Sequence, residues 1–120
     1  MVSEAQNNNR LAESNEWYEN LVSYREKLNN LKNELYYFSP GNSNTTVKKQ
    51  IDHFHNQFHI QLVNIHDLKH QIKRHKVDLE KPEGHYSPAA HRELGEKINI
   101  ETNIITELEK EFREMIEEYS

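Results

Sequence analysis

The fold is decided by residues 45–80, TTVKKQIDHFHNQFHIQLVNIHDLKHQIKRHKVDLE. Apolar side chains recur here at alternating spacings of four and three residues, with Gln61 and His75 in two places where an apolar residue is expected. The apolar members of the series are Val47, Ile51, Phe54, Phe58, Ile65, Leu68, Ile72 and Leu79. Because residues at these spacings share one side of an α-helix, the pattern predicts a long helix with a single buried stripe.

Two further stretches carry the same heptad-like series of apolar residues, which we call a seam. The earlier one holds Trp17, Leu21, Tyr24, Leu28, Leu31, Leu35 and Phe38. The later one holds Leu94, Ile98, Ile105, Leu108, Phe112, Met115 and Tyr119, with Glu101 in one apolar place. No segment sustains the alternation with a period of two that a strand requires, so the sequence predicts an all-α protein.

Residues 39–45 (SPGNSNT) and 81–88 (KPEGHYSP) separate the three stretches, because Pro, Gly, Ser and Asn disfavour the interior of a helix. Ser87 followed by Pro88 suits the N-cap and first position of a helix. We therefore expect helices over residues 14–38, 45–80 and 88–118.

The short connections favour neighbours that run in opposite directions. We expect one domain over residues 14–120, an antiparallel up-down-up bundle of three long helices. Residues 1–13 are either a frayed segment or a helical extension, since Ser3 to Gln6 fits a capping box but Asn7 to Asn9 are poor helix formers. The content of 34% hydrophobic and 29% charged residues suits such a slender bundle, in which each helix buries only one stripe.

Composition also excludes several classes of protein. The 120 residues contain no cysteine, which rules out disulfides, thiolate metal sites and a cysteine nucleophile. No apolar run is long enough for a signal peptide or a membrane-spanning helix, so we expect a cytoplasmic protein that does not enter membranes. There is no glycine-rich phosphate loop or nucleophile elbow, and we expect no enzymatic activity.

Six of the eight histidines lie in residues 45–80, and four of them, His55, His59, His66 and His70, fall within a narrow stripe beside the apolar seam. The spacing of four within each pair allows two imidazoles to hold one zinc, nickel or copper ion. His59 and His66 are about 10 Å apart along the axis, so the four cannot close around a single ion. A solvated or interface face is the competing interpretation.

Polar residues in the seams suggest a buried layer. Matching the helices across their loops places Tyr24 opposite Gln61, with Thr106 nearby and Glu101 about one turn away. A hydrogen bond between Tyr24 and Gln61 is one possibility, and it would penalise wrong registers. The alternative is that these residues only reach the edge of the bundle.

A basic pole is expected near the second loop. Its members are Lys69, Lys73, Arg74, His75, Lys76, His85, His91, Arg92 and Lys97. The net charge of −5 and the nearby glutamates favour a partly neutralised, solvated pole over a nucleic-acid site.

Several apolar residues fit no seam, notably Val63, Ile100 and Ile104. They indicate either a broad face inside a monomeric bundle or a second face buried by self-association, most simply in a homodimer. The sequence therefore favours a non-catalytic helical bundle that acts through protein contacts, as a scaffold, adaptor or accessory protein. A metal-binding or metal-responsive protein that uses the histidine stripe is the alternative.

Overall fold

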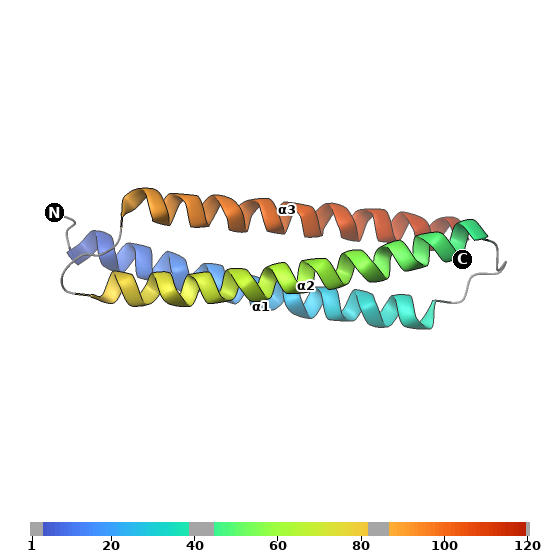
Figure 1. Ribbon diagram of the computed structural model, residues 1–120, viewed down its shortest axis with the longest axis horizontal. Helices are drawn as coiled ribbons and strands as arrows, with labels where there is room; N and C mark the ends of the chain where they lie inside the picture. The colour runs from blue at the N-terminus through green and yellow to red at the C-terminus, as the bar shows by residue number, and fades with distance from the viewer. Residues whose placement is uncertain (1–3, 39–44, 82–86, 120) are drawn as a thin grey trace.

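A computed structural model describes residues 4–38, 45–81 and 87–119. It contains three helices, α1 (Glu4–Tyr37), α2 (Thr45–Glu80) and α3 (Pro88–Tyr119), packed against one another in a rod of 63 × 17 × 17 Å (Figure 1). The expected all-α bundle is confirmed. Along the rod, α2 runs back beside α1 and α3 (Figure 1). Within the described ranges, no helix is both long and apolar enough to cross a membrane.

Helix α1 extends further toward the N-terminus than the seam beginning at Trp17 indicates. It starts at Glu4, so residues 4–13 are helical, while Ser3 of the suggested capping box lies outside the described residues. Ser14 is fully buried, and its hydroxyl donates to the carbonyl oxygen of Arg10 at 2.7 Å. Packing of this first part of the helix compensates for the poor helix propensity of the Asn residues.

The three seams form one continuous core. In the half of the rod that holds the C-terminal end of α3, the core contains the aromatic rings of Phe54, Phe58 and Phe112, with centroids 5.3–6.0 Å apart. Phe58 and Phe112 are completely shielded from solvent. Two of the pairs, Phe54–Phe112 and Phe58–Phe112, pack edge to face, and each adds about 1 kcal/mol to the free energy gained by burial.

Helix α3 begins as its sequence predicts. The backbone N–H of Ala90 donates to Ser87 Oγ at 3.0 Å, and the N–H of His91 donates to the Ser87 carbonyl oxygen at 3.3 Å. Pro88 has no N–H to satisfy. Ser87 is therefore the N-cap of α3.

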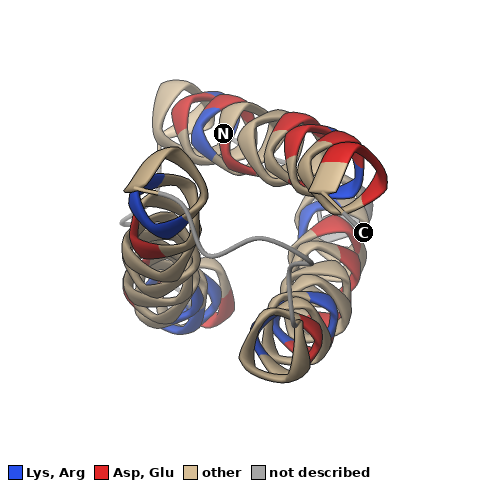
Figure 2. Ribbon diagram, turned by 90° about the vertical axis from the view of Figure 1, so that its right-hand side faces the viewer, with Lys and Arg blue, Asp and Glu red and all other residues tan. Residues whose placement is uncertain are grey.

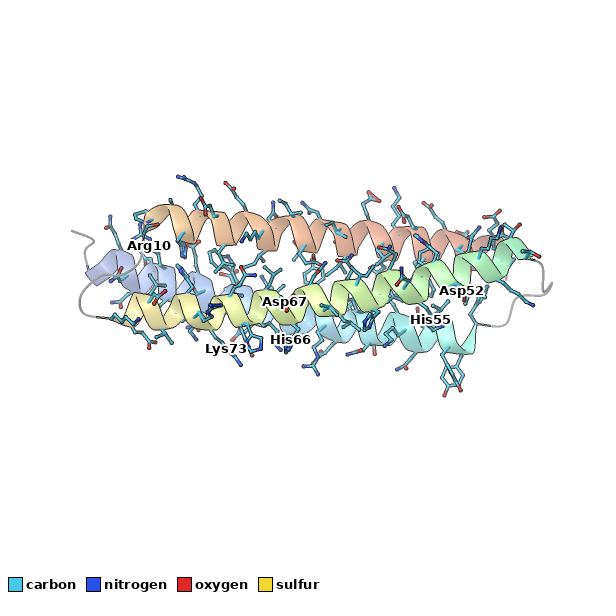
Figure 3. All side chains as sticks on the ribbon, in the orientation of Figure 1. Arg10, Asp52, His55, His66, Asp67 and Lys73 are labelled. Carbon is cyan, nitrogen blue, oxygen red and sulfur yellow. The ribbon has the colours of Figure 1, made fainter. Side chains whose placement is uncertain are left out.

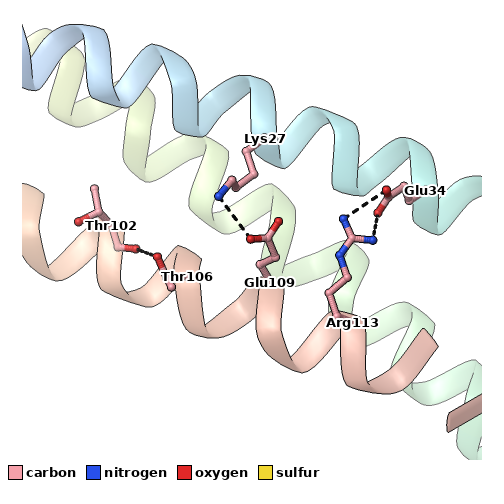
Figure 4. Close-up of polar contacts among 6 residues, drawn as sticks. All are labelled: Lys27, Glu34, Thr102, Thr106, Glu109 and Arg113. Carbon is pink, nitrogen blue, oxygen red and sulfur yellow. Dashed lines mark hydrogen bonds and ion pairs between the residues drawn. The ribbon is translucent and has the colours of Figure 1, made fainter. Parts of the chain in front are cut away.

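Ion pairs join α1 and α3 along their exposed edges (Figure 4). Arg113 donates to both carboxylate oxygens of Glu34, at 2.6 and 3.3 Å, and Lys27 Nζ lies 3.3 Å from Glu109 Oε1. Exposed pairs of this kind contribute at most about 1 kcal/mol each. Their value lies mainly in favouring one alignment of α1 against α3.

Charged residues of both signs are spread over all three helices, and acidic residues gather toward the C-terminal end of α3 (Figure 2). The chain as a whole carries a formal charge of −5. The surface is thus mixed rather than dominated by one large field.

Candidate functional site

A chain of titratable groups, two buried histidines and one exposed glutamate, links all three helices near the N-terminal end of α3. His75 Nε2 of α2 lies 2.8 Å from His91 Nδ1 of α3, and His91 Nε2 lies 3.3 Å from Glu13 Oε1 of α1. Both histidine residues are only 8% exposed. The ring of Trp17 packs against that of His91 with centroids 4.6 Å apart, which leaves His91 little freedom to rotate.

One arrangement of protons satisfies both contacts. With Glu13 ionised, His91 donates its Nε2–H to the carboxylate, so that His91 Nδ1 is free of hydrogen and accepts from the Nε2–H of His75. If both imidazoles were charged, both facing nitrogens would carry hydrogen and the 2.8 Å contact would break. The folded state therefore disfavours the doubly protonated pair.

Burial lowers the pKa of His75, and the neighbouring His91 lowers it further. Asp78 acts in the opposite direction, and Arg10 adds to the lowering. Since each of the two facing nitrogens is occupied by the other imidazole, the arrangement suits structural stabilisation better than acid–base catalysis. The seam position of His75 marked it as buried, and the sequence placed His91 and nearby glutamates at the same end of the bundle, but it did not identify the direct contacts of His91 with His75 and Glu13.

The polar layer in the middle of the bundle is made by Gln61 and Glu101. Gln61 and Glu101 are 5% and 6% exposed. When the side-chain amide of Gln61 is oriented with its nitrogen toward Glu101, that nitrogen donates to both carboxylate oxygens, to Oε2 at 3.2 Å. Burial raises the pKa of Glu101, and a hydrogen bond from Asn64 partly offsets that effect.

The suggested partners of Gln61 were wrong. Gln61 pairs with Glu101 rather than with Tyr24, and Thr106 is exposed, with its hydroxyl donating to the carbonyl oxygen of Thr102 on its own helix at 2.9 Å (Figure 4). Matching residues across the loops placed the helices with an error of about one turn. An error of that size is enough to exchange the partners in a buried layer.

The four residues of the histidine stripe, His55, His59, His66 and His70, all lie exposed on α2. The rings of His66 and His70 meet edge to face with centroids 4.6 Å apart. Among residues 4–38, 45–81 and 87–119, no three His, Asp or Glu side chains gather as a metal would require. Metal binding by the stripe remains a prediction.

The residues of the expected basic pole lie in different environments. His75 and His91 are buried, and Arg74 and Lys97 line a groove together with carboxylates of Asp78 and Glu93. By contrast, Lys69 and Lys73 reach from α2 toward α1. His85 lies outside the described residues.

A groove of about 540 Å³ runs between α2 and α3. Ile100 and Ile104 lie on its α3 wall and are 59% and 42% exposed, although Leu108 beside them is buried. On α2, Ile60 is exposed and lies between Gln57, which lines this groove, and Asn64, which lines the next one along. Three large apolar side chains thus border one face of the rod.

A second groove, of about 510 Å³, lies between α1 and α2. Its lining comprises Arg25, Asn29, Leu62, Ile65, His66 and Lys69. It combines an apolar floor with cationic and amide side chains and contains no carboxylate.

Comparisons of the chain with protein-family models, with curated proteins and with solved structures found no match.

Proposed function

We propose that the protein is a non-catalytic helical bundle that acts through protein contacts made by its α2/α3 face, and that its first partner is a second copy of the chain. The observation that carries this proposal is the exposure of Ile100 and Ile104 beside the groove. Neither side chain is buried by the packing of the three helices within one chain. A broad face inside a monomeric bundle therefore does not explain them.

The spacing on α3 supports a helix-packing face. Lys97, Ile100, Ile104, Glu107 and Glu111 follow one another at intervals of three and four, so they share one side of α3. Apolar residues lie in the middle of this row and charged residues at its ends. An apolar centre with a polar rim is the usual anatomy of a protein interface.

A second copy is the simplest occupant of this face. In a two-fold dimer the same patch serves both partners, so an apolar patch can be buried against itself with its charged ends at the rim. The antiparallel bundle presents this row along a straight rod, which allows two rods to lie side by side. Removing the isoleucines from water would supply the main driving force.

The experiment is multi-angle light scattering over a range of protein concentrations. We expect the wild-type mass to approach twice 14.4 kDa as concentration rises, and the double variant Ile100→Asn, Ile104→Asn to remain at 14.4 kDa. Val77→Asn is the control, because Val77 is 55% exposed on the histidine side of α2. A wild type that stays monomeric throughout would exclude the dimer.

Metal binding is the second candidate, favoured by the exposure of both histidine pairs and by Asp52, three residues before His55 (Figure 3). Zinc, nickel or copper would be held by one pair, with water or a partner copy completing the coordination. Titration calorimetry on chelator-treated protein should then show sub-micromolar binding that is lost in His55→Ala, His59→Ala. Binding that is absent, or unchanged in that variant, would remove this candidate for the first pair.

A further inference from the structure

The groove between α1 and α2 has the composition of an anion site. Arg25 enters its lining from α1, and His66 and Lys69 enter from α2, one helical turn apart. Asn29 supplies amide N–H donors, and Leu62 with Ile65 supplies the floor. Its volume of about 510 Å³ suits a small organic ligand.

Lys73, beside Lys69, extends this positive surface beyond the groove. The Nζ atoms of Lys69 and Lys73 lie 5.2 and 5.6 Å from the centre of the Tyr18 ring on α1. One ring thus attracts two ammonium groups that repel each other. His66 and Lys73 lie along the same edge of α2 (Figure 3).

Among the described residues, these cations have no anionic partner. In the part of the chain that the structure describes, no carboxylate lies within ion-pair distance of Arg25, Lys69 or Lys73. Lys27 and Arg113, on the α1/α3 side, are both paired with glutamates. In a chain with a net charge of −5, a concentration of unpaired positive charge in one groove is a local feature that the overall composition does not account for.

We propose that the α1/α2 groove binds a small polyanion that carries two or more phosphate groups. The guanidinium of Arg25 offers a planar pair of N–H donors to one phosphate, and the ammonium groups of Lys69 and Lys73 neutralise a second. Binding relieves the repulsion between the lysines. The apolar floor receives the uncharged part of the ligand.

The phosphate groups can come from a free polyphosphate compound or from a phosphorylated lipid headgroup. The shared chemistry is two or more phosphates within reach of one groove. Inorganic triphosphate in solution and phosphatidylcholine vesicles, with and without a phosphoinositide, distinguish the two sources.

The test is titration calorimetry of the full chain with inorganic triphosphate at low salt, together with vesicle co-sedimentation. The groove variant is Arg25→Gln with Lys69→Gln. The matched control is Lys48→Gln with Lys110→Gln, which removes the same charge from exposed positions outside the groove. Circular dichroism melting of both variants verifies that each is folded, and the single substitutions serve if the double variant is not.

We expect the dissociation constant of the groove variant to rise by at least about tenfold, and that of the control to change by less than about threefold. Groove-dependent binding of triphosphate identifies a free polyphosphate, and groove-dependent binding of phosphoinositide vesicles alone identifies a lipid headgroup. Absence of binding to both probes overturns the proposal. Equal losses in the groove and control variants also overturn it, because they would reflect net charge rather than a site.

Discussion

At the residue scale, the chemistry of the protein centres on groups that are buried with partners from other helices. His75 meets His91 and, through it, Glu13, while Gln61 meets Glu101. Each of these four buried side chains, His75, His91, Gln61 and Glu101, has a polar partner, as is usual for buried polar groups. His75 and Glu101 also make stability depend on pH, in directions that their surroundings determine.

Stability should fall in mild acid because of His75. Its pKa is lowered in the folded state, so the unfolded chain binds more protons below the ordinary value of 6.5. The stabilising contribution is complete above pH 6.5 and is lost as the pH falls toward the lowered pKa. Urea unfolding should show a smaller decline between about pH 7.5 and about pH 5.5 in His75→Gln than in the wild type, by up to about 1.4 kcal/mol per pH unit.

His59→Gln is the matched control for that experiment, since His59 is exposed on the same helix. Its decline with pH should follow that of the wild type. Equal declines in the wild type and in His75→Gln would show that the buried pair does not titrate as described.

Glu101 makes stability depend on pH in the opposite direction to His75. Its pKa is raised by burial, so the folded state favours the protonated carboxyl, and stability is lost as the pH rises through that raised pKa. Glu101→Gln replaces the carboxylate with an amide that can still bond to Gln61. We expect the melting temperature of the variant at pH 7 to rise by a few degrees, with the gain shrinking toward pH 4.

Scanning calorimetry at the two pH values measures this difference, with Glu114→Gln as the control at an exposed position of α3. A variant that melts below the wild type at pH 7 would mean that the ionised carboxylate contributes net stability.

At the element scale, α1 and α3 approach closely where Trp17 faces Gly95. A Cβ atom added to Gly95 would lie 3.0 Å from Trp17 Cζ2 and 3.3 Å from Cη2. The indole cannot easily retreat, because it also packs against His91. Glycine in the middle of α3 is thus explained by packing, despite its low helix propensity.

A double-mutant cycle tests this contact. At a helix position with free space, replacing glycine with alanine adds about 1 kcal/mol of stability. We expect this gain from Gly95→Ala to be absent in the wild type and to appear in a Trp17→Leu background, with a coupling of about 1 kcal/mol or more measured by denaturant unfolding. An equal gain in both backgrounds would mean that the indole does not crowd position 95.

The elements themselves were predictable to different degrees. Helices α2 and α3 begin at residues 45 and 88, as their breaks and the Ser87 cap indicate, because capping is local chemistry. The start of α1 was not determined, since the low propensity of the Asn residues competes with the burial of Ser14, which depends on the other helices.

At the scale of the whole molecule, the bundle follows from three seams with one period, because a stripe of apolar residues must be buried whatever its detailed contacts. Predicting which residues meet between two helices requires their relative register to within one residue. Sequence spacing therefore found the seam position of Gln61 but not its partner Glu101, and it found the i, i+4 histidine pairs but not the pairing of His75 with His91. The unpaired cations of the α1/α2 groove became visible only when α1 and α2 were placed together.

The proposed contact of the α2/α3 face with a second copy of the chain can be tested by cross-linking. The protein contains no cysteine, so a single introduced thiol reports on one position alone. Residues near a two-fold axis lie close to their own copies, which makes Ile104→Cys the direct probe and Val77→Cys its control. Under mild oxidation we expect a disulfide-linked dimer to form readily with the thiol at position 104 and slowly at position 77; equal rates at the two positions, or a faster reaction at 77, would contradict the account.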